Sequence, residues 1–171
     1  MMELRRAVMD DLPQIRAVYK EICRDMDRNG IQIWDEIYPG EVFGEDIENH
    51  RLYVLTQQKE IVSAFALCDS NPGADGVKWE NQNERAFYLD RLGVNVNYKR
   101  KGIGSLAIQK ATALAGSLGA GYLRLFVVDI NQPAINLYLK NGFTKADGIY
   151  DEVIDEDLVL HEFGYEKKTT I

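Results

Sequence analysis

The sequence predicts an α/β protein in which helices cover both faces of a mixed β-sheet. Its 171 residues are the usual length of one domain, so we expect a single domain over residues 1–171. Segments with apolar residues three or four apart, as in amphipathic helices, alternate with short β-type runs. A strand at 85–94, a helix at 102–118 and a strand at 122–128 form one βαβ unit, whose crossover should be right-handed.

The first half of the chain contains one long amphipathic helix. Apolar residues from Leu12 to Met26 follow the helical period, Asp10 or Asp11 can cap the start, and Asn29-Gly30 is a stop signal. The other elements expected here are a strand at 2–7, a short helix at 45–49, and a hairpin of strands 51–56 and 61–68 joined by residues 57–60.

The second half contains a long insertion before the βαβ unit. Residues 69–84 carry Asn-Pro-Gly and Asp-Gly turn signals and predict a long loop. Residues 122–128 include apolar side chains at both odd and even positions, which is typical of a strand covered on both faces. Asn131 can cap a further helix that ends at Asn141-Gly142. The final strands are expected at 143–145 and 153–163.

Composition and charge exclude several classes of protein. Apolar residues make up 46% and charged residues 27% of the chain, which argues against a disordered or fibrous protein. The net charge of −7 disfavours binding to nucleic acid or to an anionic membrane surface. Cys23 and Cys68 lack the spacing of a disulfide framework or a zinc site, so no metal is expected. We expect a cytoplasmic protein without a membrane segment.

A glycine-rich turn opens the helix of the βαβ unit. Three basic residues precede two glycines in the stretch Lys99-Arg100-Lys101-Gly102-Ile103-Gly104-Ser105. Glycines let backbone N–H groups approach a ligand, and a helix N-terminus carries positive partial charge, so diphosphate is the expected occupant. The glycines could instead serve only tight packing.

The same glycines leave a different cofactor open. Gly102, Gly104 and Ala107 also satisfy the dinucleotide fingerprint, with Asp129 at the end of the next strand as a ribose-binding acid. The alternative is therefore a nucleotide-cofactor (NAD-type) oxidoreductase. A P-loop is excluded because no Gly-Lys-Ser/Thr follows the required spacing.

The turn and a second stretch together resemble the GNAT superfamily of acyl-CoA-dependent N-acyltransferases. The turn is similar to the family's signature (Arg/Gln)-x-x-Gly-x-(Gly/Ala), with Lys99 where Arg or Gln is usual. Lysine keeps the charge but not the bidentate fork. Residues Asn131 to Phe143 are similar to the block Asn-x-x-Ala-x-x-(Leu/Phe)-Tyr-x-x-x-Gly-Phe. The resemblance implies a GNAT-like, mostly antiparallel sheet with one parallel βαβ unit whose strands splay apart.

The resemblance also implies a cofactor site and a reaction. Acetyl-CoA would be the acyl donor, and an acetyl group would pass by direct attack to a primary amine of a small molecule or peptide. Backbone at Leu92, Val94 and Val96 would bind the pantetheine arm, and Asn131 the pantetheine or the helix start. The diphosphate would lie on the turn, on residues Lys99, Arg100, Lys101, Gly102, Ile103, Gly104 and Ser105. A non-catalytic acyl-CoA-binding module is the second alternative, and a homodimer stays open.

Two residues are candidates for proton transfer. The Tyr138 phenol is protonated at neutral pH and can protonate a departing thiolate. Asp90 shares the strand parity of Val94 and would face the acyl site as a base, unless a bulge intervenes. Asp90 could equally be a solvated charge or a partner of Arg91, and a water chain could replace a base.

Two segments are candidates for the acceptor pocket, residues 31–44 and 69–84. Trp34 and Tyr38 could line that pocket, or they could anchor a long loop to the core.

Overall fold

The strands form one eight-stranded sheet in the order β1-β2-β3-β4-β5-β8-β6, with β7 paired to β8. A computed structural model describes residues 1–35 and 38–170. The strands are β1 Met2–Arg6, β2 Leu52–Gln57, β3 Glu60–Cys68, β4 Ala86–Val94, β5 Tyr122–Val128, β6 Thr144–Lys145, β7 Tyr150–Val153 and β8 Val159–Lys168. The β4–β5 pair is parallel, whereas β1–β2, β2–β3, β5–β8, β6–β8 and β7–β8 are antiparallel. The predicted α/β class with a mixed, mostly antiparallel sheet is thus confirmed.

Four α-helices accompany these strands in the described part of the chain. They are α1 Leu12–Arg28, α2 Phe43–Glu48, α3 Ile103–Ser117 and α4 Gln132–Lys140, with short 3-10 turns at Met9–Asp11, Ala74–Gly76 and Val96–Tyr98. None of these helices combines the length and apolar character needed to cross a bilayer.

The chain divides into two compact units. The first unit comprises Met1–Leu67 and Arg91–Lys110, and the second comprises Cys68–Asp90 and Ala111–Ile171. Strand β4 and helix α3 each contribute residues to both units. The two units are described separately below.

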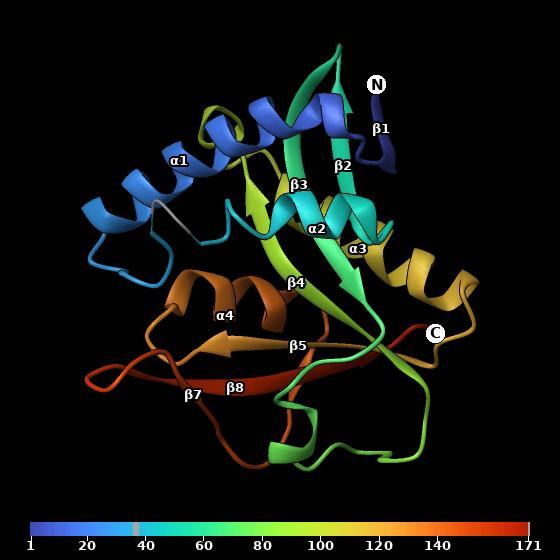
Figure 1. Cartoon of the computed structure of the whole chain (residues 1–171). Helices are drawn as coiled ribbons and strands as arrows, with labels where there is room; N and C mark the ends of the chain where they lie inside the picture. Colours follow the sequence, from blue (N-terminus) through green and yellow to red (C-terminus); the bar gives the residue numbers. More distant parts are fainter. Residues whose placement is uncertain (36–37, 171) are drawn as a thin grey trace. The chain divides into compact units, whose positions relative to one another are not determined.

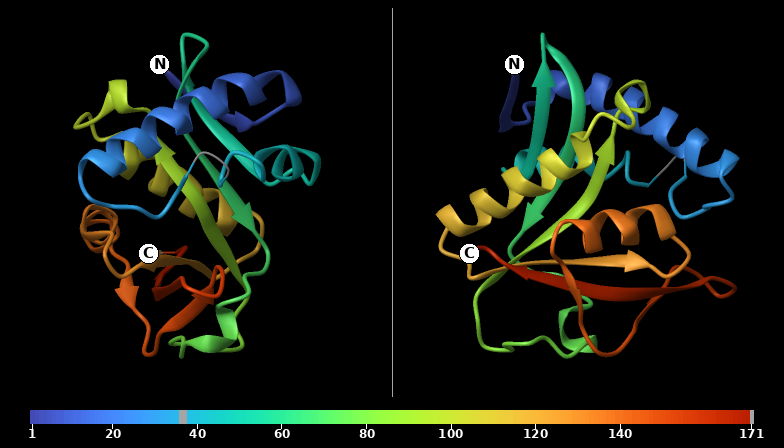
Figure 2. Two further views of the ribbon diagram at one scale, coloured as in Figure 1. Left: turned by 60° about the vertical axis from the view of Figure 1, so that its left-hand side comes forward. Right: turned by 180° about the vertical axis from the view of Figure 1, so that it is seen from behind.

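The first unit is built on the β2–β3 hairpin, across which α1 lies (Figures 1 and 2). The turn of the hairpin is two residues long, shorter than the expected four, because Gln58 and Lys59 both adopt left-handed φ values of 49° and 70°. Such turns match the twist of paired strands. The Tyr19 hydroxyl of α1 donates to the Ala64 carbonyl of β3 at 2.9 Å, which joins the helix to the hairpin.

The second unit is built on the long β5–β8 pair, in which Tyr122 to Val128 face Lys168 to Glu162. Helix α4 and the segment 69–84 lie on opposite faces of this pair (Figures 1 and 2). On the face toward the segment, Trp79 and Phe126 pack edge to face with centroids 5.6 Å apart. Val77, Tyr88 and Ala146 complete this buried apolar cluster.

The expected final strand at 153–163 is wrong. The chain forms the β7–β8 hairpin here, with the Ile154 N–H donating to Leu158 across an exposed acidic turn. Strand β8 then continues to Lys168 because residues 162–168 pair with the whole of β5. Tertiary pairing overrides the weak strand signal of Glu166-Lys167-Lys168.

Candidate active site

The glycine-rich turn lies in the first unit, between the 3-10 turn Val96–Tyr98 and the start of α3. Arg100 and Gly102 adopt left-handed φ values of 62° and 76°, and a Cβ on Gly102 would meet no atom within 4 Å. The first backbone bond at this end of α3 runs from the Leu106 N–H to the Gly102 carbonyl at 3.0 Å. The N-terminus of a helix carries the positive end of the helix dipole, so this end of α3 favours an anion.

The three basic side chains of the turn have different surroundings. Lys99 forms an ion pair with Asp25 of α1, and the Lys101 ammonium lies 5.2 Å from the centroid of the Tyr98 ring. Arg100 is exposed and makes no ion pair with a described residue. An anion at this turn could therefore contact Arg100 directly. Lys99 would first have to break its ion pair with Asp25.

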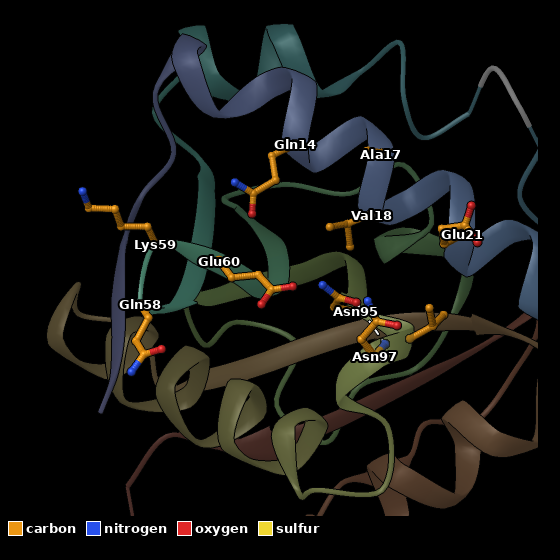
Figure 3. A pocket seen from close by; sticks show the side chains of 10 residues that line it. Gln14, Ala17, Val18, Glu21, Gln58, Lys59, Glu60, Asn95 and Asn97 are labelled. Carbon is orange, nitrogen blue, oxygen red and sulfur yellow. Dashed lines mark hydrogen bonds between the residues drawn. The ribbon is translucent and has the colours of Figure 1, made fainter.

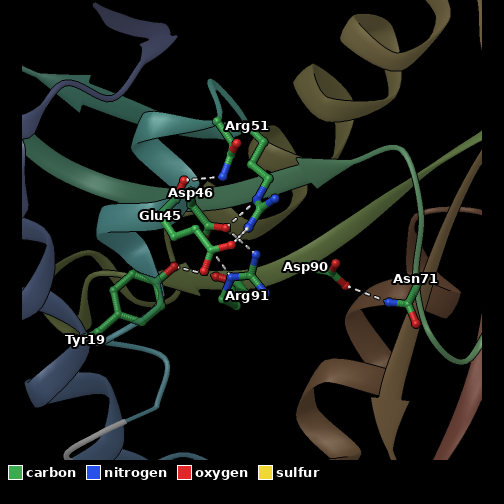
Figure 4. Close-up of polar contacts among 8 residues, drawn as sticks. Tyr19, Glu45, Asp46, Arg51, Asn71, Asp90 and Arg91 are labelled. Carbon is green, nitrogen blue, oxygen red and sulfur yellow. Dashed lines mark hydrogen bonds and ion pairs between the residues drawn. The ribbon is translucent and has the colours of Figure 1, made fainter.

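A buried ion network fixes the strand that leads to the turn. Asp46 of α2 is completely buried and accepts hydrogen bonds from Arg51 Nε at 2.6 Å and from Arg91 Nη2 at 2.7 Å (Figure 4). Although burial alone would lower the pKa of Arg91, Asp46 and Tyr38 raise it, so this guanidinium stays charged. The Tyr19 hydroxyl also lies 2.5 Å from the Arg91 carbonyl, so its one O–H is shared between this carbonyl and that of Ala64.

This network holds Arg91 in a left-handed conformation, with φ at 56°. Such a conformation interrupts the regular alternation of β4, as in a bulge. Strand parity alone therefore no longer predicts that the side chains of Asp90 and Val94 lie on the same face of the sheet. The backbone of Leu92, Val94 and Val96, expected to meet the pantetheine arm, comes directly after this irregularity.

The second unit contains Asn131, Tyr138 and Asp90. The Asn131 side chain accepts from the Ala134 N–H at 3.4 Å, so it caps α4 as predicted. Tyr138 is buried with its ring centroid 5.6 Å from that of Phe143. Burial first, and the nearby Asp90 carboxylate second, raise the pKa of Tyr138, so its phenol remains protonated at neutral pH.

Asp90 lies two residues beyond the parallel β4–β5 register, which ends at Tyr88 and Arg124. Its carboxylate accepts from the Asn71 amide of the segment 69–84 at 3.3 Å (Figure 4). The Arg91 guanidinium pairs with Asp46. Asp90 is thus placed within electrostatic reach of Tyr138, a proximity that sequence spacing could not reveal.

Sequence reasoning missed a further acid in this unit, Glu162. Its side chain is 9% exposed, and burial together with the acidic groups Glu152 and Asp90 raises its pKa to about 9. A charged residue in a weakly patterned strand gave no signal, because its burial depends on β7 and β5 pairing around it.

The two candidate acceptor residues differ in exposure. The Trp34 ring packs 5.6 Å from the Tyr19 ring, as the loop-anchor alternative expects, whereas Tyr38 is exposed. Tyr38 nevertheless contributes to the raised pKa of Arg91.

A separate pocket of about 610 Å³ opens in the first unit between α1, the hairpin turn and the Val96–Tyr98 turn (Figure 3). Its lining mixes polar and apolar surface and comes from Gln14, Ala17, Val18, Glu21, Gln58, Lys59, Glu60, Asn95, Val96 and Asn97. Val96 is the one predicted site residue among them.

The chain is similar to known proteins both in sequence and in fold. Residues 15–143 match the model of the Acetyltransferase (GNAT) family. A thialysine N-epsilon-acetyltransferase from Bos taurus is 29% identical over 153 residues, covering 85% of this chain and 87% of the relative. The crystal structure of a GNAT-family acetyltransferase from Streptococcus agalactiae 2603 superposes with a TM-score of 0.82 at 18% identity, covering 98% and 95% of the two chains. The ribosomal-protein-S18-alanine N-acetyltransferase of Escherichia coli gives 0.68 at 17% identity, covering 100% and 96%.

The sheet topology and these relatives define an acyltransferase of the α/β class. The chain belongs to the GNAT acetyltransferase family, whose co-substrate is acetyl-CoA. The family match confirms the resemblance based on the turn and on the block from Asn131 to Phe143, and it does not support the NAD-type oxidoreductase.

Proposed function

We propose that the protein is an N-acetyltransferase that moves the acetyl group of acetyl-CoA to a primary amine by direct attack. The observation that carries the proposal is the family match. The conformation of the signature turn at residues 99–105 agrees with it. Arg100 and Gly102 are both left-handed there, and the space beside Gly102 is open. We further propose that one N-acyltransferase domain spans residues 1–171.

The residues of the turn fit a diphosphate. An exposed Arg100 offers charge, the α3 N-terminus offers N–H donors, and an open Gly102 lets an anion approach the backbone. We assign the diphosphate to Lys99, Arg100, Lys101, Gly102, Ile103, Gly104 and Ser105. The pantetheine arm is assigned to backbone at Leu92, Val94 and Val96, and to Asn131.

Acetyl-CoA, when bound, supplies an acetyl group activated as a thioester. The nitrogen of the amine forms a bond to the carbonyl carbon as the carbon–sulfur bond breaks. Tyr138 gives its phenolic proton to the departing sulfur, and a proton leaves the nitrogen. Because burial and Asp90 keep the phenol protonated, Tyr138 holds that proton until negative charge develops on sulfur. Asp90 is the proposed partner for the proton of the amine.

The acceptor in this proposal is an amine of a small molecule or peptide. Support comes from the relative from Bos taurus, which is a thialysine N-epsilon-acetyltransferase. Trp34 and Tyr38 stay candidates for acceptor contacts, Tyr38 through its exposed ring.

Thermal unfolding with ligands tests the cofactor, and thiol release tests the reaction. CoA should raise the melting temperature, because a ligand that binds only the native state stabilises it. NAD should not raise it. Release of CoA thiol from acetyl-CoA should then depend on an added amine.

The variant Tyr138→Phe separates an enzyme from a binding module. It should lower kcat by about 10²–10⁴-fold while the CoA-induced shift is retained, since general acid catalysis is typically worth that much. Tyr165→Phe, which removes the same oxygen from another buried tyrosine of the second unit, is the matched control. A folded Tyr138→Phe protein with full kcat would refute the role of Tyr138, and CoA binding without any transfer would indicate the non-catalytic module.

A further inference from the structure

Lys99 occupies the position of the glycine-rich turn at which this chain departs from the family signature, where Arg or Gln is usual. Its ammonium forms an ion pair with Asp25 of α1, a residue 74 positions earlier in the sequence. The Lys99 side chain is 49% exposed and the Asp25 side chain 26% exposed, so water reaches both charges. Glutamine at position 99 would form no such pair. The pair is therefore a property of this chain and not a requirement of the turn.

Other contacts hold the backbone of the turn in place. The buried Asn95 side chain donates to the Ile61 carbonyl of β3 at 3.0 Å. The Tyr98 hydroxyl donates to the Glu60 carboxylate of the same strand at 2.5 Å. Because neither contact involves the Lys99 side chain, the Lys99 ammonium can exchange its partner while the turn stays where it is.

Asp25 opposes the binding of an anion at the turn in two ways. Its carboxylate holds the Lys99 ammonium, and its own negative charge repels an anion that would replace it there. Within residues 1–35 and 38–170 the Asp25 side chain forms no other ion pair, so it is left to water when Lys99 moves to an anion. A turn that served anion binding alone would gain nothing from an acid at this place.

We propose that Asp25 competes with the diphosphate of CoA for Lys99 and thereby lowers the affinity of the protein for its cofactor. This inference rests on the proposed function, because it takes the diphosphate to lie on the turn. In the free protein Lys99 pairs with Asp25; in the complex Lys99 contacts the diphosphate and Asp25 is hydrated. Asp25 touches neither the acetyl group nor the diphosphate, so it acts on binding through Lys99. The product CoA carries the same diphosphate, so Asp25 weakens the binding of acetyl-CoA and of CoA alike.

The size of the effect follows from the exposure of the pair. An exposed ion pair is worth about 0.2–1 kcal/mol, which corresponds to about 1.4- to 5-fold in a dissociation constant. Removing the Asp25 charge should therefore tighten CoA binding by a factor in that range. The opposite result is expected if the pair serves to position Lys99 for the cofactor, because its loss would then weaken binding.

Calorimetric titration of the full chain with CoA measures this factor. Asp25→Asn should lower the Kd for CoA by about 1.4- to 5-fold, and the KM for acetyl-CoA in the thiol-release assay should fall with it. The Kd of Asp25→Asn should also rise more steeply with salt than that of the wild type, since Lys99 then contributes a charge contact without first breaking one. Dephospho-CoA, which keeps the diphosphate and lacks the 3′-phosphate, should show the same gain. Thermal unfolding without ligand shows that each variant is folded.

Two controls separate competition for Lys99 from a general change of charge. Asp27→Asn makes the same charge change two residues further along α1, at an exposed position that forms no ion pair within the described part of the chain. Its Kd for CoA should stay close to that of the wild type. In a Lys99→Gln background, Asp25→Asn should produce no more gain than Asp27→Asn, because the competition requires the lysine.

The inference is overturned if Asp25→Asn binds CoA as the wild type does, or more weakly, or if Asp27→Asn gives an equal gain. A gain that persists in the Lys99→Gln background overturns it too, as does one restricted to CoA and absent with dephospho-CoA. Tighter CoA binding by Asp25→Asn without acetyl transfer to any amine would leave the inference standing and refute the proposed function. Acetyl transfer with an unchanged Kd in Asp25→Asn would do the reverse.

Discussion

Replacement of Asp46 by asparagine tests the buried ion network that precedes the glycine-rich turn. Asp46 is completely buried, and its two oxygens accept hydrogen bonds from Arg51 Nε and from Arg91 Nε and Nη2 at 2.6–2.8 Å. Asparagine keeps the size and one acceptor oxygen but removes the negative charge. The charge of Arg91, whose side chain is 10% exposed, then loses the buried counter-ion that Asp46 provides.

The magnitude follows from the burial of the two partners. Removing one member of a buried ion pair costs about 3–5 kcal/mol, because the remaining charge stays in a poorly polarisable environment. Arg51 is 30% exposed and can turn to water, so most of the cost falls on Arg91. We therefore expect Asp46→Asn to lower the free energy of unfolding by about 3–5 kcal/mol.

Urea denaturation measures this free energy, with an unchanged m-value as the sign that the change is one of stability. Adding Arg91→Met to Asp46→Asn removes the stranded charge, so the double variant should be more stable than Asp46→Asn alone. Glu45→Gln is the control, because Glu45 is 68% exposed and lies 3.7 Å from Arg51. An exposed pair contributes about 0–1 kcal/mol. Equal losses in Asp46→Asn and Glu45→Gln would falsify the reasoning.

Three further predictions address the strand, the turn and the buried acid. Gly93→Ala should destabilise the protein by about 1–3 kcal/mol in the same assay, because the added Cβ would lie 2.7 Å from the Tyr19 ring and 2.8 Å from Ile22. Arg100→Ala should weaken CoA binding, and the loss should shrink between 50 mM and 500 mM salt in calorimetric titrations, since salt screens an exposed charge; a loss independent of salt would contradict a charge contact. The Glu162 pKa is raised to about 9, so the folded chain binds more protons than the unfolded chain above the ordinary glutamate pKa of about 4.3. The free energy of unfolding of the wild type should therefore fall as pH rises through that window. In thermal unfolding, Glu162→Gln should become more stable compared with the wild type as pH approaches 9, but not at pH 4.

Local patterns predicted the elements that have strong local signals. Asn131 caps α4 as expected, because an Asn side chain three residues before a free N–H is a purely local arrangement. Helix α1 likewise begins beside Asp11 and ends at Asn29, although the Asp11 carboxylate accepts hydrogen bonds from Arg5 and Val8 and makes no helix cap. The β7–β8 hairpin was missed, because the pairing partner of a strand is not encoded in its own residues.

The sequence by itself determined the α/β class, the signature turn and the block around Tyr138, because glycine placement and apolar period act over a few residues. The tertiary structure decided which charges are buried. Asp46 and Glu162 belong to segments without distinctive patterns, yet one is enclosed with two guanidinium groups and the other with two carboxyl groups. The free energy of a charge depends on the groups that surround it in space, and those groups include residues far away in the sequence, Arg91 for Asp46 and Asp90 for Glu162.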